Sequence, residues 1–491
     1  MELGNIVEFL ENKCILITGA TGFLAKIFLE KVLRVQPKIR KIYLLLRAED
    51  EISAARRFQN EIVGKDLFRV LKERCGANWN SFLLEKTIVV KGDISADDEL
   101  GIENPTLKER MYNDIDVVIN LAATTTFDER YDVAFGINTM GPLHVLRFAA
   151  RCTNLRVLVH VSTAFVAGER SGLILETPHQ LGDALNGVTG LDILEEKKLV
   201  LEKLSQLHDA RASNDEIKAE MKELGLERAR KYGWPNTYVF TKAMGEMLIG
   251  RTKGTMSVPI IRPTIVSSTF KEPFPGWVEG MRTVDTFTVA YGTGRVTCFL
   301  GDLQGIIDAI PADMVVNAMI VAMVAHAKQP HSTVYHVGSS ARNPLKYHNI
   351  PDYGYRYFSK KPWIAKDGKP VAVKRVKIID SMASFHRYMA LRYLVGLKAL
   401  ELVNMAMCQL FDETYSNLKR KINFVMRLVD LYRPYLFFYG TFDDTNTEGL
   451  RMAARQNGSE AELFYFDPKV IDWDDYVMKA HIPGVVKYVF R

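Results

Sequence analysis

Cysteine is scarce in this sequence, and its few copies are far apart. The 491 residues include five cysteines, with no Cys-x-x-Cys pair and no Cys/His cluster at metal-ligand spacing. This scarcity excludes a disulfide-stapled secreted fold and a structural zinc site. We therefore expect a reducing compartment and no metal centre.

Long apolar runs and targeting segments are also missing. No stretch reaches the roughly 18 consecutive apolar residues that a membrane-spanning helix needs. The N-terminal sequence MELGNIVEFL is short and acidic, and the first apolar strand follows almost at once. We therefore expect no spanning helix, no signal peptide and no plastid transit peptide.

A strong excess of one charge is absent as well. The formal net charge is +6 and the isoelectric point is about 8.8. This mildly basic balance suits phosphate-bearing small ligands or an anionic membrane surface, and it argues against a nucleic-acid partner. With 47% hydrophobic residues the chain can bury a large core, and its length predicts more than one domain.

The first third of the chain alternates short apolar runs with helical stretches. Runs suited to strands buried on both faces occupy 14–18, 42–46, 87–90, 117–121 and 157–161. Helical sequence lies between them, as at 24–34 and 141–152. This alternation predicts an α/β fold with a Rossmann-type, doubly wound parallel sheet.

Changes in composition suggest domain boundaries. We predict a large α/β domain over 1–340, with a charged helical insert at about 190–231 that is either a solvated decoration or a substrate lid. Residues 341–377 are expected to be a linker that is Lys-rich from 360 onward. Residues 378–491 are expected to form a second, mostly helical domain, in which the Met and aromatic side chains of 382–411 form a core or, alternatively, line an acyl tunnel.

The sequence TGATGFLA (18–25) ends the first predicted strand and opens a helix. Gly19 permits a tight turn, Gly22 lets backbone N–H groups approach a pyrophosphate, and Ala25 allows close helix packing. In this strand-turn-helix context the motif predicts a dinucleotide site. Its expected members are Thr18, Gly19, Thr21, Gly22, Phe23 and Leu24.

Residues after the next strands bear on which nucleotide binds. Arg47 stands 22 residues after Ala25, where an NAD-preferring site usually has an acid, so we expect it to pair with a 2′-phosphate and favour NADP. Asp93 and Ile94 are expected to hold the adenine, and Ala122 to run beside the nicotinamide ribose. Each of Asp93, Ile94 and Ala122, taken singly, also fits an ordinary strand-to-loop junction.

Carbonyl reduction needs an acid, and Tyr-x-x-x-Lys on a helix can supply one. Tyrosine has an unperturbed pKa of about 10, and a lysine one turn away lowers it toward working pH. The pattern occurs four times, but only Tyr238 and Lys242 lie inside the α/β domain at the start of an apolar helix. We predict that this pair is catalytic and also contacts the cofactor.

Two more polar residues are candidates for the same site. The fifth strand ends in Ser162 and Thr163; one hydroxyl would bind the substrate oxygen and the other would satisfy backbone, and we favour Thr163 for the substrate. Asn138 in GINTMG is expected to bind a water that relays protons to Lys242. A helix-bending or capping amide is the alternative reading of Asn138.

Together, TGATGF, NLAA, STAFV, YVFTK and IIRPTIV resemble the extended short-chain dehydrogenase/reductase pattern over roughly residues 10–340. The segment EPFPGWVEG, the insert before Tyr238 and the helical C-terminal part are similar to the alcohol-forming fatty acyl-CoA reductases, in particular the plant enzymes, with their C-terminal male-sterility domain. Two positions depart from the pattern: Ala25 replaces the third glycine, and Phe165 stands where tyrosine is common.

This resemblance implies NADPH-dependent reduction of a long-chain or very-long-chain fatty acyl-CoA to a primary alcohol. The thioester would pass through an aldehyde-level intermediate with release of coenzyme A, and Tyr238 and Thr163 would stabilise the oxyanion. The resemblance also implies peripheral association with the cytosolic face of the endoplasmic reticulum. Assembly into a homo-oligomer stays open.

Three other functions stay open at this point. A sugar-nucleotide epimerase or dehydratase, or a sterol dehydrogenase, shares the Tyr/Lys pair, although Arg47 and the apolar C-terminal part count against sugar chemistry. A non-catalytic NADP-binding scaffold would be expected to lack Tyr238, Lys242 or Thr163, and all three are present. The third alternative is a reductase that releases the aldehyde as its product, and product analysis would distinguish it from an alcohol-forming enzyme.

Overall fold

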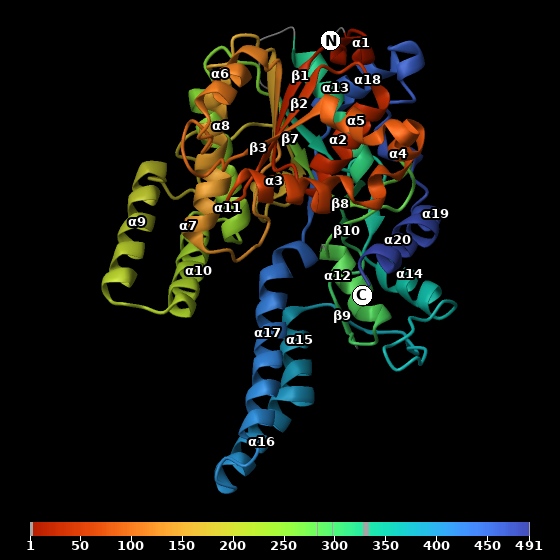
Figure 1. Cartoon of the computed structure of the whole chain (residues 1–491). Coiled ribbons are helices and arrows are strands. Elements are labelled where there is room, and N and C mark those ends of the chain that lie inside the picture. Colours follow the sequence, from red (N-terminus) through yellow and green to blue (C-terminus); the bar gives the residue numbers. More distant parts are fainter. Residues whose placement is uncertain (1–2, 282, 297, 328–332, 491) are drawn as a thin grey trace.

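A seven-stranded, all-parallel sheet forms the centre of the computed structural model, which describes residues 3–281, 283–296, 298–327 and 333–490 (Figure 1). The strand order is β3-β2-β1-β4-β5-β7-β12. The predicted Rossmann-type fold is confirmed, and the five predicted strands are found with ends that agree within one residue. The strands are β1 (Cys14–Thr18), β2 (Lys41–Leu46), β3 (Thr87–Lys91), β4 (Val117–Asn120), β5 (Val157–Val161), β7 (Ile260–Pro263) and β12 (Val334–Val337).

Helices cover both faces of this sheet, so its strands are mostly apolar. All residues of β1, β4 and β5 are buried. On one face lie α2 (Phe23–Val35) and α13 (Ala312–His326), and on the other α8 (Gly141–Ala149) and α11 (Thr237–Thr252) (Figure 1). Helix α13 is buried on all sides because α1 (Ile6–Leu10) and α18 (Thr445–Arg455) pack on its outer surface.

The order of the strands reverses between β1 and β4. Strand β1 pairs with β2 on one side and with β4 on the other, all in parallel. In open parallel sheets the ligand lies outside the carboxyl ends of the strands at such a switch point. The topology therefore places a ligand site above Thr18 and Asn120, the last residues of β1 and β4.

The charged insert forms two antiparallel helices at the side of the sheet, α9 (Ile193–Asp209) and α10 (Asn214–Lys231) (Figure 1). Buried Glu196 of α9 pairs with Arg228 of α10 and accepts a hydrogen bond from Tyr131 Oη at 2.7 Å. These contacts fasten the inner face of the insert to α7 (Tyr131–Ala134) and leave much of α9 exposed.

The C-terminal part of the chain is interleaved with the sheet domain. Strand β15 (Gly440–Phe442) pairs with β6 (Gly172–Ile174), and β14 (Lys377–Ile379) pairs with β9 (Cys298–Leu300). Buried Glu176 accepts hydrogen bonds from His336 N (2.7 Å) and Thr447 Oγ1 (2.7 Å), which ties α18 to β12. The structure thus joins the two expected domains through paired strands.

The segment expected as a linker, 341–377, contains ordered elements. It includes β13 (Leu345–Lys346) and α14 (Asn349–Phe358), and α14 packs against α12 (Thr283–Gly292). The reason is local: NIPDYGYRYF carries apolar and aromatic residues at helical spacing, and Ile350, Tyr353 and Phe358 are buried. The Lys and Pro residues that suggest a linker lie after α14.

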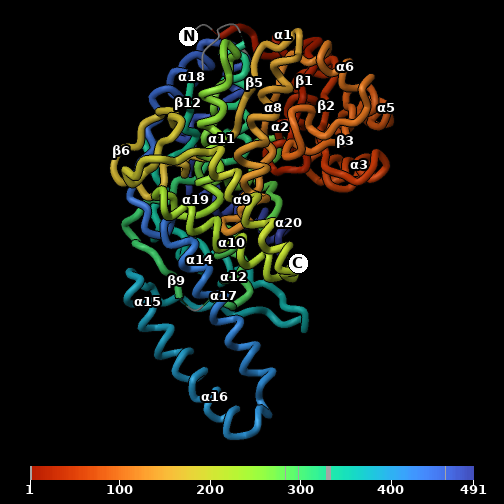
Figure 2. The backbone as a smooth tube through the Cα atoms, turned by 90° about the vertical axis from the view of Figure 1, so that its left-hand side faces the viewer, coloured from red at the N-terminus to blue at the C-terminus, as the bar shows by residue number. Residues whose placement is uncertain are grey.

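A long helical hairpin extends from the body of the molecule (Figures 1 and 2). It consists of α15 (Met382–Met389), a π-helical turn (Ala390–Leu394), α16 (Val395–Ala406) and α17 (Asp412–Leu436), and we call residues 382–436 the hairpin. The side chains of 382–411, expected to form a core, are mostly exposed, because only the base of the hairpin meets the body. There Phe385 and Met389 pack on Leu300 and Ile379.

Shorter elements complete the described ranges, and none of the helices found there is both long and apolar enough to cross a bilayer. The remaining helices and strands are α3 (Glu51–Arg57), α4 (Arg69–Cys75), α5 (Trp79–Lys86), α6 (Pro105–Asp114), β8 (Ile265–Ser267), β10 (Ile306–Ile307), β11 (Ala309–Pro311), α19 (Trp473–Tyr476) and α20 (Ile482–Tyr488).

Candidate active site

The glycine turn between β1 and α2 forms a cradle at the switch point. Gly19 has a φ of +65°, and a Cβ atom there would lie 2.6 Å from Ala122 Cα, so only glycine fits. Gly22 caps α2 without a side-chain hydrogen bond, and its N–H donates to Gly19 O at 2.8 Å. The first-turn N–H groups of α2 have no side-chain cap in this geometry, and a pyrophosphate fits there.

The neighbouring members of the motif also lie around this turn. Thr21 and Leu24 are half-buried, whereas Phe23 is buried and its ring stacks on Trp277 with centroids 5.2 Å apart. Trp277 belongs to EPFPGWVEG (272–280), one of the segments on which the family resemblance rests. This segment packs against the start of α2 and thereby supports the cradle.

A buried hydrogen-bond chain fixes the ends of three strands. Thr18 Oγ1 donates to Asn120 Oδ1 (2.7 Å) and accepts from the backbone N–H of Leu121 (3.2 Å) and Ala122 (3.3 Å). Asn120 Nδ2 lies 3.1 Å from His160 Nδ1 on β5, and burial holds the pKa of His160 well below its usual value. Thr18 and Ala122, two of the expected cofactor-binding residues, are thus in direct contact, and their cofactor roles stay predictions. Sequence reasoning missed Asn120 and His160.

The residues expected to select the nucleotide lie at the ends of β2 and β3. Arg47 directly follows β2, is exposed, and its carbonyl oxygen accepts from Arg57 of α3. Asp93 uses one carboxylate oxygen to accept from Ser95 N (2.9 Å) and Ser95 Oγ (2.8 Å). Ile94 is buried against Gly141 of α8. The adenine-binding role of Asp93 and Ile94 stays a prediction.

Tyr238 lies in the first turn of α11, and Lys242 lies one turn further on the same face. The helix starts where Asn236 Oδ1 accepts from Val239 N at 3.1 Å. Tyr238 is half-buried, whereas Lys242 is fully buried and its Nζ donates to Val161 O at 2.8 Å. Burial lowers the pKa of Lys242 to about 8, although Glu246 opposes this shift. At neutral pH the ammonium is still mostly charged.

A buried ion pair stands one further turn along α11. Arg262 of β7 donates to Glu246 through Nε (3.0 Å to Oε1) and Nη2 (2.6 Å to Oε2). Both side chains are at most 2% exposed. Burial alone would raise the pKa of Glu246, but the Arg262 charge and its hydrogen bonds bring that pKa down to about 2. Lys242, Glu246 and Arg262 thus form a buried series of alternating charge: positive, negative and positive.

Sequence reasoning missed this pair, although one signal was available. Glu246 stands four residues after Lys242 inside an otherwise apolar helix, so it shares the face of Lys242 and needs a buried cation. The sequence around Glu246 does not show which cation pairs with it, because Arg262 lies on a different element, β7.

Thr163 and Asn138 are both buried, and the turns to which they belong pack against α11. Thr163 lies two residues after β5 and its Oγ1 accepts from Phe165 N at 3.3 Å, which leaves its hydroxyl hydrogen available to a ligand. Asn138 lies in a π-helical turn (Phe135–Met140), and its amide exchanges hydrogen bonds with backbone atoms of Thr124 at 3.1 and 3.0 Å. Its Nδ2 also donates to Thr241 Oγ1 at 3.1 Å. This geometry supports the capping alternative, and the water relay stays a prediction.

Phe127 stacks beside Tyr238, and two tyrosines from the base of the hairpin pack on Phe127. The Phe127 ring stacks on Tyr238 (6.1 Å between centroids) and on Tyr435 of α17 (4.9 Å), and Tyr432 is 5.1 Å from Phe127. Asn236 Nδ2 donates to Tyr435 Oη at 2.9 Å. We call Phe127, Tyr432 and Tyr435 the aromatic cover. It makes the approach to Tyr238 apolar, a property that sequence reasoning did not assign to these residues.

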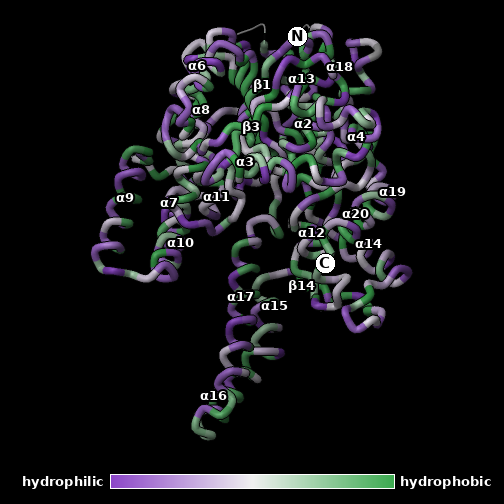
Figure 3. The backbone as a smooth tube through the Cα atoms, in the orientation of Figure 1, coloured by the Kyte–Doolittle hydropathy of each residue, from purple (hydrophilic) through white to green (hydrophobic). Residues whose placement is uncertain are grey.

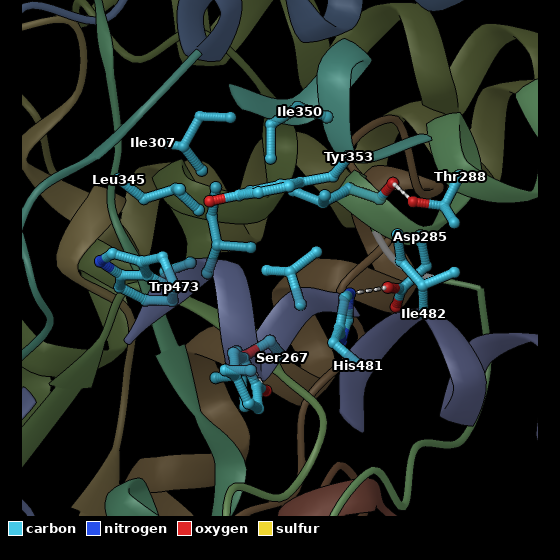
Figure 4. Close-up of a pocket in the computed structure, with 16 residues that line it drawn as sticks. Ser267, Asp285, Thr288, Ile307, Leu345, Ile350, Tyr353, Trp473, His481 and Ile482 are labelled. Carbon is cyan, nitrogen blue, oxygen red and sulfur yellow. Dashed lines mark hydrogen bonds and ion pairs between the residues drawn. The ribbon is translucent and has the colours of Figure 1, made fainter. Parts of the chain in front are cut away.

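A separate small cavity of about 30 Å³ lies among β8, α12, α14 and the C-terminal helices (Figure 4). Apolar side chains of Ile307, Leu345 and Trp473 line it, and His481 Nε2 lies 3.1 Å from Asp285 Oδ1 at its edge. It shares no residue with the predicted site. At the switch-point site, Tyr238 and buried Lys242 lie one turn apart on α11, an arrangement suited to hydride transfer at a carbonyl.

Comparison with known proteins gives matches over the whole chain. A family described as male sterility protein matches residues 17–319, and a second family with the same description matches 392–491. The alcohol-forming fatty acyl-CoA reductase of Simmondsia chinensis is 57% identical over 492 residues, covering 100% of both chains. Fatty acyl-CoA reductase 1 of Arabidopsis thaliana is 51% identical and covers 99% of both chains.

Solved structures share the fold at much lower identity. The reductase domain of a nonribosomal peptide synthetase from Mycobacterium tuberculosis is 17% identical, with a TM-score of 0.56, over 97% of this chain and 93% of that chain. This likeness supports the arrangement of the sheet and its helices.

Proposed function

The chain belongs to the family of alcohol-forming fatty acyl-CoA reductases, and on this premise we propose that it reduces a long-chain or very-long-chain fatty acyl-CoA to a primary alcohol with NADPH. The observation that carries the proposal is the fully buried Lys242 one turn after Tyr238, whose ring stacks on Phe127 of the aromatic cover. The reaction would pass through an aldehyde-level intermediate and release coenzyme A.

The chain's own residues account for binding of the dinucleotide. The N–H groups at the start of α2 would hold the pyrophosphate, and Arg47 would pair with the 2′-phosphate. Bound NADPH supplies one hydride to each of two reductions. The aromatic cover would keep bulk water away from the reacting carbon.

Proton transfer is assigned to Tyr238. As hydride reaches the thioester carbon, Tyr238 Oη protonates the carbonyl oxygen while the Thr163 hydroxyl donates a hydrogen bond to it. Charged Lys242 favours the tyrosinate that remains. Collapse of the hemithioacetal breaks the C–S bond, returns the hydroxyl proton to Tyr238 and expels the thiolate, which takes a proton from solvent. A second hydride and a second proton then convert the aldehyde to the alcohol.

The product assay tests this function directly. Purified protein with NADPH and acyl-CoAs of increasing chain length is expected to give primary alcohol, with two NADPH oxidised per thioester consumed. Gas chromatography identifies the lipid product, and absorbance follows NADPH. Aldehyde as the sole product at one NADPH per thioester would establish the early-release alternative, and no consumption of any acyl-CoA would contradict the proposal.

Reversing the charge at Arg47 should shift the choice of nucleotide. Arg47→Glu removes the expected partner of the 2′-phosphate, and charge-assisted hydrogen bonds contribute about 1.5–3 kcal/mol, so KM for NADPH should rise about 10- to 100-fold. KM for NADH should stay constant or fall. Steady-state kinetics with both nucleotides measure this.

The matched control is Arg56→Glu, the same charge change at an exposed position of neighbouring α3. It should change KM for NADPH less than about threefold, because a long-range charge effect is screened by salt. An equal rise in KM for both variants would mean that Arg47 has no specific partner on the nucleotide.

We also propose that the protein works at the cytosolic face of the endoplasmic reticulum as a peripheral membrane protein. The proposal is supported by the amphiphilic acyl-CoA that its family relatives' names specify as substrate. Acyl chains of this kind partition into bilayers, so an enzyme beside the bilayer would meet a higher substrate concentration.

A further inference from the structure

The far half of the hairpin exposes an unusual density of large apolar side chains. Several are more than half exposed, and Figure 3 shows hydrophobic colour concentrated around α16 at the tip. They are Leu391 (79%), Val395 (62%), Leu402 (58%), Met405 (68%), Leu410 (69%) and Phe424 (65%). Soluble surfaces seldom group such residues unless something binds there.

The hairpin also carries a positive net charge. Residues 382–436 contain eight Lys and Arg against four Asp and Glu, a net charge of +4. Exposed Lys419, Arg420 and Lys421 lie in the first half of α17, within the far half of the hairpin. Of the acidic groups, Glu401 is already engaged, with Lys398 Nζ at 2.7 Å and Tyr415 Oη at 2.8 Å.

Charge complementarity selects the partner for this surface. A second copy of the hairpin would bring the same net charge of +4 against the first, which opposes self-association. Apolar side chains flanked by Lys and Arg instead match an anionic bilayer, where the apolar groups enter the acyl boundary and the cations meet lipid phosphates. A hairpin of this kind lies in the interface and needs no spanning helix.

The hairpin connects its tip to the active site through a single helix. Helix α17 runs from the tip at Asp412 to Tyr432 and Tyr435 of the aromatic cover, and its 25 residues span about 37 Å. Beside the base of the hairpin lies an open cavity of about 460 Å³, lined by Glu169, Asp380, Ser381, Met382, Arg433 and Phe437.

We propose that the tip of the hairpin, residues 391–424, docks on an anionic membrane surface and inserts its apolar side chains into the interface. Docking positions the site so that Tyr238 receives acyl chains from the bilayer side. The substrate part of this inference rests on the proposed function, whereas the membrane contact does not.

Vesicle flotation tests the contact with the full chain. The tip variant replaces four exposed residues with serine, and the control variant replaces four equally exposed apolar residues on the body. The tip variant is Leu402→Ser, Met405→Ser, Leu410→Ser and Phe424→Ser, and the control is Ile52→Ser, Leu84→Ser, Leu194→Ser and Leu201→Ser. Vesicles are phosphatidylcholine alone, or phosphatidylcholine with phosphatidylserine.

Wild type and control should float with the phosphatidylserine vesicles, and the tip variant should bind at least tenfold more weakly. Replacing Lys419, Arg420 and Lys421 with glutamine should weaken binding to the anionic vesicles by at least tenfold and have little effect on the neutral ones. Circular dichroism should be the same for all four proteins. Reduction of a short, water-soluble acyl-CoA should also be unchanged, since the tip is remote from Tyr238.

Three outcomes overturn the inference. The first is that the wild type does not float with the vesicles, and the second is that the tip variant floats as well as the control. The third is that light scattering shows a dimer for the wild type and a monomer for the tip variant, which would make a second copy of the chain the partner. If tip-dependent flotation occurs while no acyl-CoA is reduced, the membrane contact stands and the proposed enzyme function fails.

Discussion

Tyr238→Phe is expected to lower kcat for acyl-CoA reduction by about 10²- to 10⁴-fold, the usual contribution of a positioned general acid. The variant loses only the hydroxyl, so the ring keeps its stacking on Phe127 and α11 keeps its packing. NADPH affinity should therefore change little. Stopped-flow absorbance of NADPH oxidation and fluorescence titration of NADPH measure the two quantities.

Tyr435→Phe is the matched control because it removes another hydroxyl from the same aromatic neighbourhood. This hydroxyl accepts from Asn236 Nδ2, and its loss should cost about 1 kcal/mol of stability and less than a tenfold change in kcat. Retention of more than a tenth of the wild-type kcat by Tyr238→Phe would remove Tyr238 from the role of acid. A larger loss in the control would point to positioning by the cover instead.

Arg262→Met should destabilise the folded chain by about 3–5 kcal/mol, because it leaves Glu246 buried without its cation. Urea unfolding followed by tryptophan fluorescence measures the change. The double variant Arg262→Met with Glu246→Leu should recover much of the loss, since no unpaired charge remains. Losses that simply add in the double variant would contradict a direct charge pairing.

The loss of unfolding free energy caused by Arg262→Met should depend on pH, and the sign follows from the pKa of Glu246. The pKa of Glu246 is about 2 when folded against 4.5 for an unperturbed group, so its ionisation stabilises the fold above pH 4.5. That contribution is lost as the pH falls toward about 2. In Arg262→Met, burial without the Arg262 charge raises the pKa of Glu246 above its ordinary value, so the variant gains stability as the pH falls through that raised pKa. The difference in stability between wild type and Arg262→Met should therefore be largest at neutral pH and should narrow steadily toward acid.

Much of the sheet and the Tyr238/Lys242 pair could be predicted because their signals are local. A buried parallel strand is apolar at nearly every position, as in Cys14–Thr18, and Gly19 is fixed by a turn a few residues long. Lys242 lies one turn after Tyr238 whatever surrounds the helix. Such features depend on the backbone period and on neighbours in sequence.

Features that depend on distant contacts could not be predicted in the same way. Arg262 meets Glu246 only because β7 lies beside α11, and Tyr435 reaches Phe127 only because the chain returns to the sheet after the hairpin. The apolar periodicity of 382–411 indicates a helix but does not say what covers it. The sequence supports a core there, and the structure exposes most of those side chains because only the base of the hairpin meets the body.

The pairing of β15 with β6 has a consequence for how the protein is made. The sheet and both members of the Tyr238/Lys242 pair leave the ribosome long before Tyr435 and Gly440, which cover the site and complete the β6 edge. Until those residues emerge, β6 has an unpaired edge and Asn236 lacks its phenolic partner. The surroundings of Tyr238 are thus completed only late in synthesis, after the hairpin has been made.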